Sequence, residues 1–152
     1  DRAMLLNNIA ITHVKSEKYD SARSCFNESL SIRQNAMPKN DPDIAVSHAN
    51  LGVVLSLLGE STRANQHYNL ALTSFFSNEF DIYRAIVYQN LATICENEHQ
   101  FDSALKFYQN AENVFQKLRP ADHPNLIHVQ QQIKKLQQQQ QNLLPKFYSN
   151  NV

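Results

Sequence analysis

The strongest constraint on this chain is a pattern that recurs three times at intervals of slightly more than forty residues. Each copy has an asparagine, a large aliphatic residue and then alanine or glycine, and its asparagines, Asn8, Asn50 and Asn90, lie 42 and 40 residues apart. An alanine follows twelve residues after each small residue, and an aromatic ring follows four residues after that alanine. These six positions are Ala22, Ala64 and Ala104, and Phe26, Tyr68 and Tyr108. Self-similarity at a fixed period indicates a repeat architecture.

Each repeat is predicted to be a hairpin of two α-helices. Two antiparallel helices approach closely only where both carry small side chains, so Ala10, Gly52 and Ala92 with their following alanines mark the helix crossings. Apolar residues around these positions recur at helical intervals. Paired prolines, at Pro38 and Pro42 and at Pro120 and Pro124, interrupt the pattern and can open the next helix.

The predicted hairpins span residues 2–36, 42–77 and 80–118. No proline separates the second hairpin from the third, so polarity alone places that break near Ser77–Glu79. A fourth helix is expected over 123–143, followed by a flexible tail over 144–152.

The fourth helix is expected to cap the array. Ile133 stands where Leu51 stands in the second repeat, but the neighbouring small position holds Lys134. That long cation would obstruct a following helix, and the glutamines around it make the outer side polar, as a terminal cap requires. As an alternative, the glutamine-rich stretch fits a disordered low-complexity segment.

These residues resemble the tetratricopeptide repeat, whose W-x2-L-G-x2-Y and A-x3-F signature is matched by the L-[GA] and A-x3-[FY] elements. The longer period and the proline-bearing linkers look like the repeats of kinesin light chains. The chain departs from the signature at His13, Leu55 and Cys95, where an aromatic is expected. Over Arg2 to Gln140, the resemblance implies an all-α, right-handed α-solenoid of about three helical hairpins plus a C-terminal capping helix, with the array ending near residue 143.

The resemblance also implies a non-catalytic scaffold or adaptor that binds a protein or peptide in a concave groove lined by the first helix of each hairpin. An asparagine carboxamide both donates and accepts, so it can pair with a peptide N–H and C=O together. Alternatively, each asparagine bonds to a neighbouring helix and keeps the array regular. The predicted groove consists of Met4, Asn7, Asn8, Ile11, Lys15, Val46, Asn50, Val53, Ser56, Leu57, Ile86, Gln89, Asn90, Thr93, Glu96 and Asn97.

The kind of partner follows from the residues beside these asparagines. In related co-chaperone repeats, basic residues there clamp a terminal carboxylate, but Met4, Val46 and Ile86 are apolar, and Glu96 would repel an acidic chain end. We therefore expect a partner with apolar side chains and an accessible backbone.

The sequence gives little support for nucleic-acid binding, membrane binding, catalysis or metal binding. Lysine plus arginine and aspartate plus glutamate number 14 each, so net charge favours neither nucleic acid nor an anionic membrane as partner. The sequence holds no nucleophile elbow, P-loop, H-E-x-x-H or C-x-x-C motif. We expect no catalysis, no cofactor and no metal site, with Cys25 and Cys95 structural.

Two cysteines without a C-x-x-C spacing suit a reducing cytosol, and no apolar run approaches the ~20 residues needed to cross a bilayer. We therefore expect a cytoplasmic protein. The first residue is Asp1, which indicates a fragment or a processed product. An alternative function is therefore a regulatory or targeting module of a larger multidomain enzyme whose catalytic domain lies outside this chain.

Overall fold

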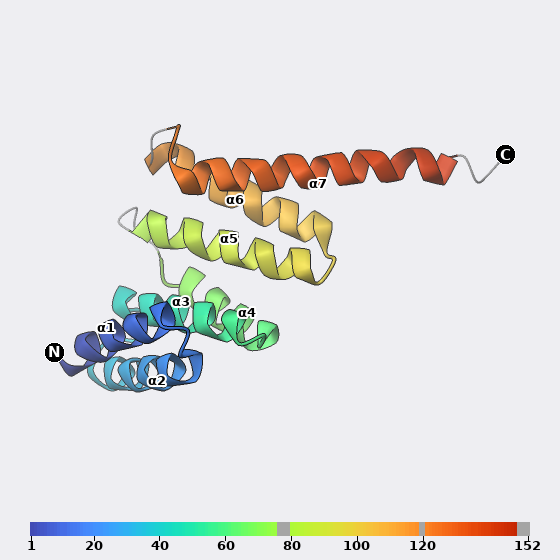
Figure 1. Ribbon diagram of the computed structural model, residues 1–152. Helices are drawn as coiled ribbons and strands as arrows, with labels where there is room; N and C mark the ends of the chain where they lie inside the picture. The colour runs from blue at the N-terminus through green and yellow to red at the C-terminus, as the bar shows by residue number, and fades with distance from the viewer. Residues whose placement is uncertain (76–79, 119–120, 149–152) are drawn as a thin grey trace. The chain divides into compact units, whose positions relative to one another are not determined.

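The computed structural model describes residues 1–75, 80–118 and 121–148, with side chains described as far as residue 142 (Figure 1). Over these residues the chain forms seven α-helices and no strand, which confirms the all-α prediction. The helices are α1 (Arg2–Lys15), α2 (Tyr19–Ala36), α3 (Pro42–Leu57), α4 (Ser61–Leu72), α5 (Asp81–Asn97), α6 (Phe101–Leu118) and α7 (Pro124–Tyr148).

The chain forms two compact units, residues 1–87 and 88–152, and the boundary falls within α5. In the first unit α1 packs on α2, α2 on α3, and α3 on α4. In the second unit, the Tyr88 ring of α5 stacks on Phe107 of α6, and α6 packs on α7. Each unit has its own apolar core; the buried residues include Phe26, Leu51, Val54 and Tyr68 in the first and Leu91, Tyr108, Phe115 and Val129 in the second.

The small positions of the repeat are all buried, and Ala10, Ala22, Ala64, Ala92 and Ala104 are each 0% exposed. In the second hairpin, however, the closest neighbour of Gly52 is an aromatic ring and not Ala64. A Cβ atom added to Gly52 would lie 2.5 Å from Cε1 of Tyr68. The glycine therefore makes room for the ring of Tyr68, which comes four residues after Ala64.

The same turn closes all three hairpins. Glu17, Gly59 and His99 occupy equivalent positions and have positive φ angles of 58°, 78° and 60°. The next residue in each turn donates its N–H to a carbonyl five residues back: Lys18 to His13 at 2.9 Å, Glu60 to Leu55 at 2.8 Å and Gln100 to Cys95 at 2.8 Å. This is the Schellman arrangement, which satisfies carbonyls at a helix C-terminus.

The first linker has the helix break and restart that its prolines predict. Asp41 caps α3, its carboxylate accepting from the N–H of Asp43 at 2.9 Å, and Pro42 is the first helical residue. In the second hairpin α4 ends at Leu72. The break predicted near Ser77–Glu79 lies outside the described residues, as does Pro120.

The last helix is longer than the sequence predicts. α7 continues to Tyr148, whereas the sequence predicts a helix end at residue 143 and a tail from residue 144. Glutamine and leucine are good helix formers, and one proline near a C-terminus removes a single backbone donor. The stretch Gln137–Gln141 is helical rather than irregular, and Lys134 is exposed. Residues 149–152 lie outside the described part.

Candidate functional site

One side of the first unit carries the predicted groove residues of α1 and α3, and we call it the asparagine face. Its residues are Met4, Asn7, Asn8, Ile11 and Lys15 of α1 and Val46, Asn50, Val53, Ser56 and Leu57 of α3. Every one of them is at least partly exposed. Their spacing of three or four residues places them on one side of each helix, while Ala10, Leu51 and Val54 between them are buried.

The two helices are joined on this face by a pair of asparagines. The Nδ2 group of Asn50 donates to Oδ1 of Asn7 at 2.9 Å. The structure thus shows, for Asn50, the bond to a neighbouring helix that the second interpretation of the asparagines expected. Neither carboxamide makes another hydrogen bond among the described residues, so Nδ2 of Asn7 and Oδ1 of Asn50 keep their bonding capacity.

The remaining side chains of the asparagine face are aliphatic or extend into solvent. Met4, Ile11 and Leu57 are 55%, 39% and 49% exposed. Asn8 is also exposed; the hydroxyl of Thr12 donates to its backbone carbonyl at 3.1 Å, and its side chain makes no hydrogen bond among the described residues. Within the described residues Lys15 forms no ion pair. The face therefore combines amide groups, exposed aliphatic groups and one free cation.

In the second unit, the groove residues of α5 form a connected polar network. The Tyr108 hydroxyl of α6 lies 3.3 Å from the Thr93 hydroxyl and donates to Glu96 at 3.2 Å. Lys135 of α7 donates to the other oxygen of Glu96 at 2.5 Å. Burial, the largest influence, raises the pKa of Tyr108. Glu96 is therefore paired with a cation, so it repels an acidic ligand less than the sequence alone suggests.

The other predicted residues of this second set are Gln89, Asn90 and Asn97. Gln89 accepts the Thr93 hydroxyl through its backbone carbonyl at 3.1 Å. Gln89 and Asn90 are half-buried, whereas Asn97 is exposed. Among the described residues none of the three side chains makes a hydrogen bond, so their amide groups stay available. Ile86, the remaining residue of the predicted groove, lies in the first unit and is 36% exposed.

Residues 1–75 match the family model described as Tetratricopeptide repeat. The chain contains tetratricopeptide repeats (TPRs). The matched segment comprises the first two hairpins and the whole asparagine face. No curated protein matches the sequence.

Solved TPR structures share this fold. BtubC (BKLC) from P. vanneervenii is 18% identical with a TM-score of 0.72, and the match covers 99% of this chain and 65% of that one. The first TPR of Spaghetti (RPAP3), bound to the HSP90 peptide SRMEEVD, is 17% identical with a TM-score of 0.67, over 90% of this chain and 91% of that one. The Sgt2 TPR domain from Aspergillus fumigatus is 11% identical with a TM-score of 0.70, over 94% and 82%.

These identities establish a common fold and no more. The chain spans less than two thirds of the length of BtubC. The long period and the likeness to BtubC are consistent with the kinesin-light-chain type of TPR expected from the sequence.

Two histidines and one cysteine, His48, His67 and Cys95, are at least partly buried in the helical hairpins. His48 is 8% exposed, and its Nδ1 lies 2.8 Å from Nδ1 of His67. Burial and then the neighbouring His67 lower the pKa of His48 to about 4, and burial followed by Arg63 lowers the pKa of His67. Burial and then Glu98 raise the pKa of the Cys95 thiol. At neutral pH all three groups are uncharged.

Sequence reasoning missed two partners. His67 lies outside the repeat signature, and Lys135 comes 39 residues after Glu96, so only the folded chain brings each to its partner. The part of the chain that the structure describes has no group of three histidine, cysteine, aspartate or glutamate residues placed to hold a metal ion. No described helix is long and apolar enough to span a bilayer.

Proposed function

We propose that this TPR chain is a non-catalytic scaffold that holds an extended peptide segment along the asparagine face. The observation that carries the proposal is the bond between Asn50 and Asn7, because it leaves a donor on α1 beside an acceptor on α3. A peptide unit has one N–H and one C=O. It can donate to Oδ1 of Asn50 and accept from Nδ2 of Asn7, whatever its own side chains are.

The aliphatic residues of the face would supply the rest of the binding energy. Met4, Ile11 and Leu57 leave apolar surface exposed around the asparagine pair. Burial of such surface contributes roughly 25 cal/mol per Å². A partner segment with aliphatic or aromatic side chains therefore suits the face better than a purely polar one.

The proposed partner differs from the acidic peptide in the Spaghetti structure. That peptide, SRMEEVD, carries three acidic residues. On the asparagine face the only cation is Lys15, and Met4 and Val46 stand where the clamp of related repeats would place basic residues. We therefore propose a weakly charged partner peptide, with no nucleic acid or membrane as ligand.

A peptide-display selection on the purified chain, followed by affinity measurement on the selected peptide, tests the proposal. The test variant replaces Asn7, Asn8 and Asn50, all on the asparagine face, with alanine. The matched control replaces Asn27, Asn69 and Asn110, which are exposed asparagines on α2, α4 and α6. The proposal expects at least a tenfold loss of affinity in the test variant and less than a twofold change in the control. Equal losses in both variants would refute it.

A further inference from the structure

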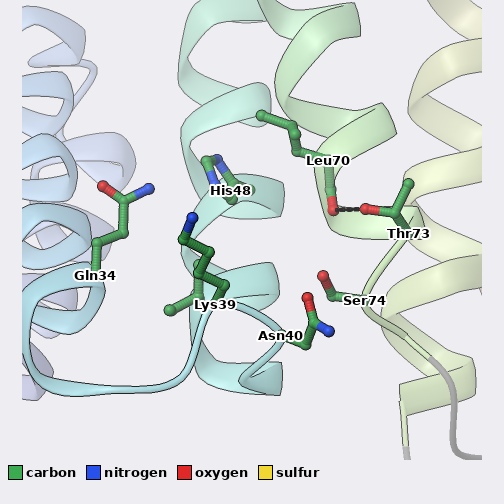
Figure 2. Close-up of a pocket in the computed structure, with 8 residues that line it drawn as sticks. Gln34, Lys39, Asn40, His48, Leu70, Thr73 and Ser74 are labelled. Carbon is green, nitrogen blue, oxygen red and sulfur yellow. Dashed lines mark hydrogen bonds between the residues drawn. The ribbon is translucent and has the colours of Figure 1, made fainter.

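A recess lies in the first unit, and its lining is separate from the asparagine face. It has a volume of about 400 Å³ and is formed by the end of α2, the linker to α3, one side of α3 and the end of α4. Figure 2 shows the ribbons of α2 and α4 on either side of α3, with the lining side chains between them. No residue of the asparagine face contributes to it.

The polar lining is rich in donors and contains no carboxylate. Its polar residues are Gln34, Lys39, Asn40, His48, Thr73 and Ser74. Lys39 supplies the only formal charge and forms no ion pair among the described residues. In Figure 2 the amino group of Lys39 points towards His48, and Asn40 lies next to Ser74. The recess therefore offers a cation and several neutral donors to an anionic group.

A buried cation next to the recess strengthens this preference. Arg33 is 7% exposed, and its Nη1 donates to the carbonyl of Asp43 at 2.8 Å and to the hydroxyl of Ser47 at 2.7 Å. Both acceptors are neutral, and Arg33 makes no ion pair within the described residues. Ser47 directly precedes His48 in α3, so Arg33 bonds to a residue next to the lining of the recess.

Two aspartates, Asp41 and Asp43, follow Lys39 closely in the sequence. The Asp41 carboxylate accepts from the backbone N–H of Asp43 as the cap of α3. The Asp43 residue is exposed to solvent. Neither aspartate lines the recess.

Two aliphatic side chains complete the lining. Leu70 of α4 is 50% exposed, and Ile44 of α3 is buried; both line the recess. Apolar and cationic surface thus meet within one small volume. A volume of about 400 Å³ lies at the low end of ligand pockets, large enough for one or two side chains.

We propose that this recess is a second peptide-binding site, which takes a carboxylate next to a leucine-sized side chain. The carboxylate lies at Lys39 and the aliphatic group on Leu70 and Ile44. A phosphate group fits less well, because a single lysine without an accessible arginine fork neutralises only part of its charge. The TPR unit would then hold a weakly charged segment on the asparagine face and an acidic, aliphatic segment here.

The test is an NMR titration of the ¹⁵N-labelled full chain with three probes. These are N-acetyl-leucyl-glutamate amide, its neutral counterpart N-acetyl-leucyl-glutamine amide, and isovalerate as a free carboxylic acid. The proposal expects shifts of backbone amides over residues 34–48 and 70–74, with the glutamate probe binding at least threefold tighter than the glutamine probe. Isovalerate should bind more weakly than the glutamate probe.

Two variants make the result specific. Lys39→Gln should abolish the preference for glutamate over glutamine, whereas Lys15→Gln, which removes the unpaired lysine of the asparagine face, should leave it intact. The ¹⁵N spectra show directly that each variant is folded. Equal binding of the two dipeptides, isovalerate binding as tight as the glutamate probe, shifts confined to the asparagine face, or no shifts at the solubility limit would each overturn the proposal.

Discussion

Gly52 lies so close to the ring of Tyr68 that a Cβ atom at position 52 would come within 2.5 Å of Cε1 and 2.7 Å of Cδ1. Tyr68 is fully buried, so its ring cannot swing into solvent to make room. This contact sets how closely α3 and α4 approach. The two glycines of the chain thus have different structural roles. A Cβ atom added to Gly59 would meet no atom within 4 Å, and Gly59 instead adopts a positive φ.

Replacement of Gly52 with alanine should destabilise the first unit. Overpacking of a core costs about 1–3 kcal/mol, and it outweighs the gain of about 1 kcal/mol that alanine brings to a helix interior. Urea unfolding followed by circular dichroism measures the change. In a Tyr68→Leu background the same substitution should cost much less, since the ring is gone. A Gly52→Ala chain as stable as wild type would show that the contact is not tight.

Replacement of Glu17 with glycine should stabilise the chain. Glu17 has a φ of 58° in the turn of the first hairpin, where Gly59 stands in the second. A left-handed conformation costs a residue with a Cβ atom about 1 kcal/mol, and glycine avoids this cost. The free energy of unfolding should therefore rise by about that amount. Glu17→Ala, which removes the carboxylate but keeps the Cβ atom, should show no such gain; equal gains in both variants would assign the effect to charge.

Acidification should destabilise the first unit through the histidine pair. The pKa of His48 is lowered from 6.5 to about 4 in the folded chain, mainly by burial. Between these values the unfolded chain binds more protons, so stability is intact above pH 6.5 and falls as the pH drops towards 4. One pKa unit corresponds to about 1.4 kcal/mol, and after solvent screening we expect a loss of about 1–2 kcal/mol.

Denaturant unfolding at several pH values measures this loss. A variant with both His48 and His67 replaced by glutamine shares all the carboxylates of the wild type, so the difference between the two pH profiles isolates the histidines. Superimposable profiles would contradict the expected role of the pair.

Asn50→Ala should change stability only slightly. The bond from Asn50 to Asn7 is half-exposed, and a neutral hydrogen bond contributes about 0.5–1.5 kcal/mol. We expect a loss of less than about 1 kcal/mol and an unchanged helical signal in circular dichroism. A cooperative loss of helix would mean that Asn50 serves the fold rather than a ligand.

The helical hairpins could be predicted because the sequence repeats its small and aromatic residues at one period and breaks helices with paired prolines. Contacts between the two helices of a hairpin were harder to predict from the sequence. Spacing placed Ala64 and Tyr68 near Gly52, but the direction of each Cα–Cβ bond decides which of them touches the glycine. The turns could not be predicted from the residue types. Glu17 and His99 have positive φ angles, which glycine usually signals, but only the second hairpin has a glycine there, Gly59.

The exposure of the candidate site's residues was predictable from the sequence, but the bonds between them were not. Helical periodicity placed Asn7, Asn8 and Asn50 on exposed surface. The bond between Asn7 and Asn50 spans 43 residues, and that between Glu96 and Lys135 spans 39. Such pairs depend on how neighbouring helices stack, which no local pattern encodes.

The most direct test of the central claim replaces backbone N–H groups of the bound peptide. A peptide selected on the wild-type chain is resynthesised with each amide N–H in turn replaced by an ester oxygen, and its affinity is measured for wild type and for Asn50→Ala. If Asn50 accepts from the peptide backbone, one ester should weaken binding to wild type by about three- to tenfold and leave binding to Asn50→Ala unchanged. If every ester affects both proteins equally, the asparagine face does not hold the backbone of a peptide.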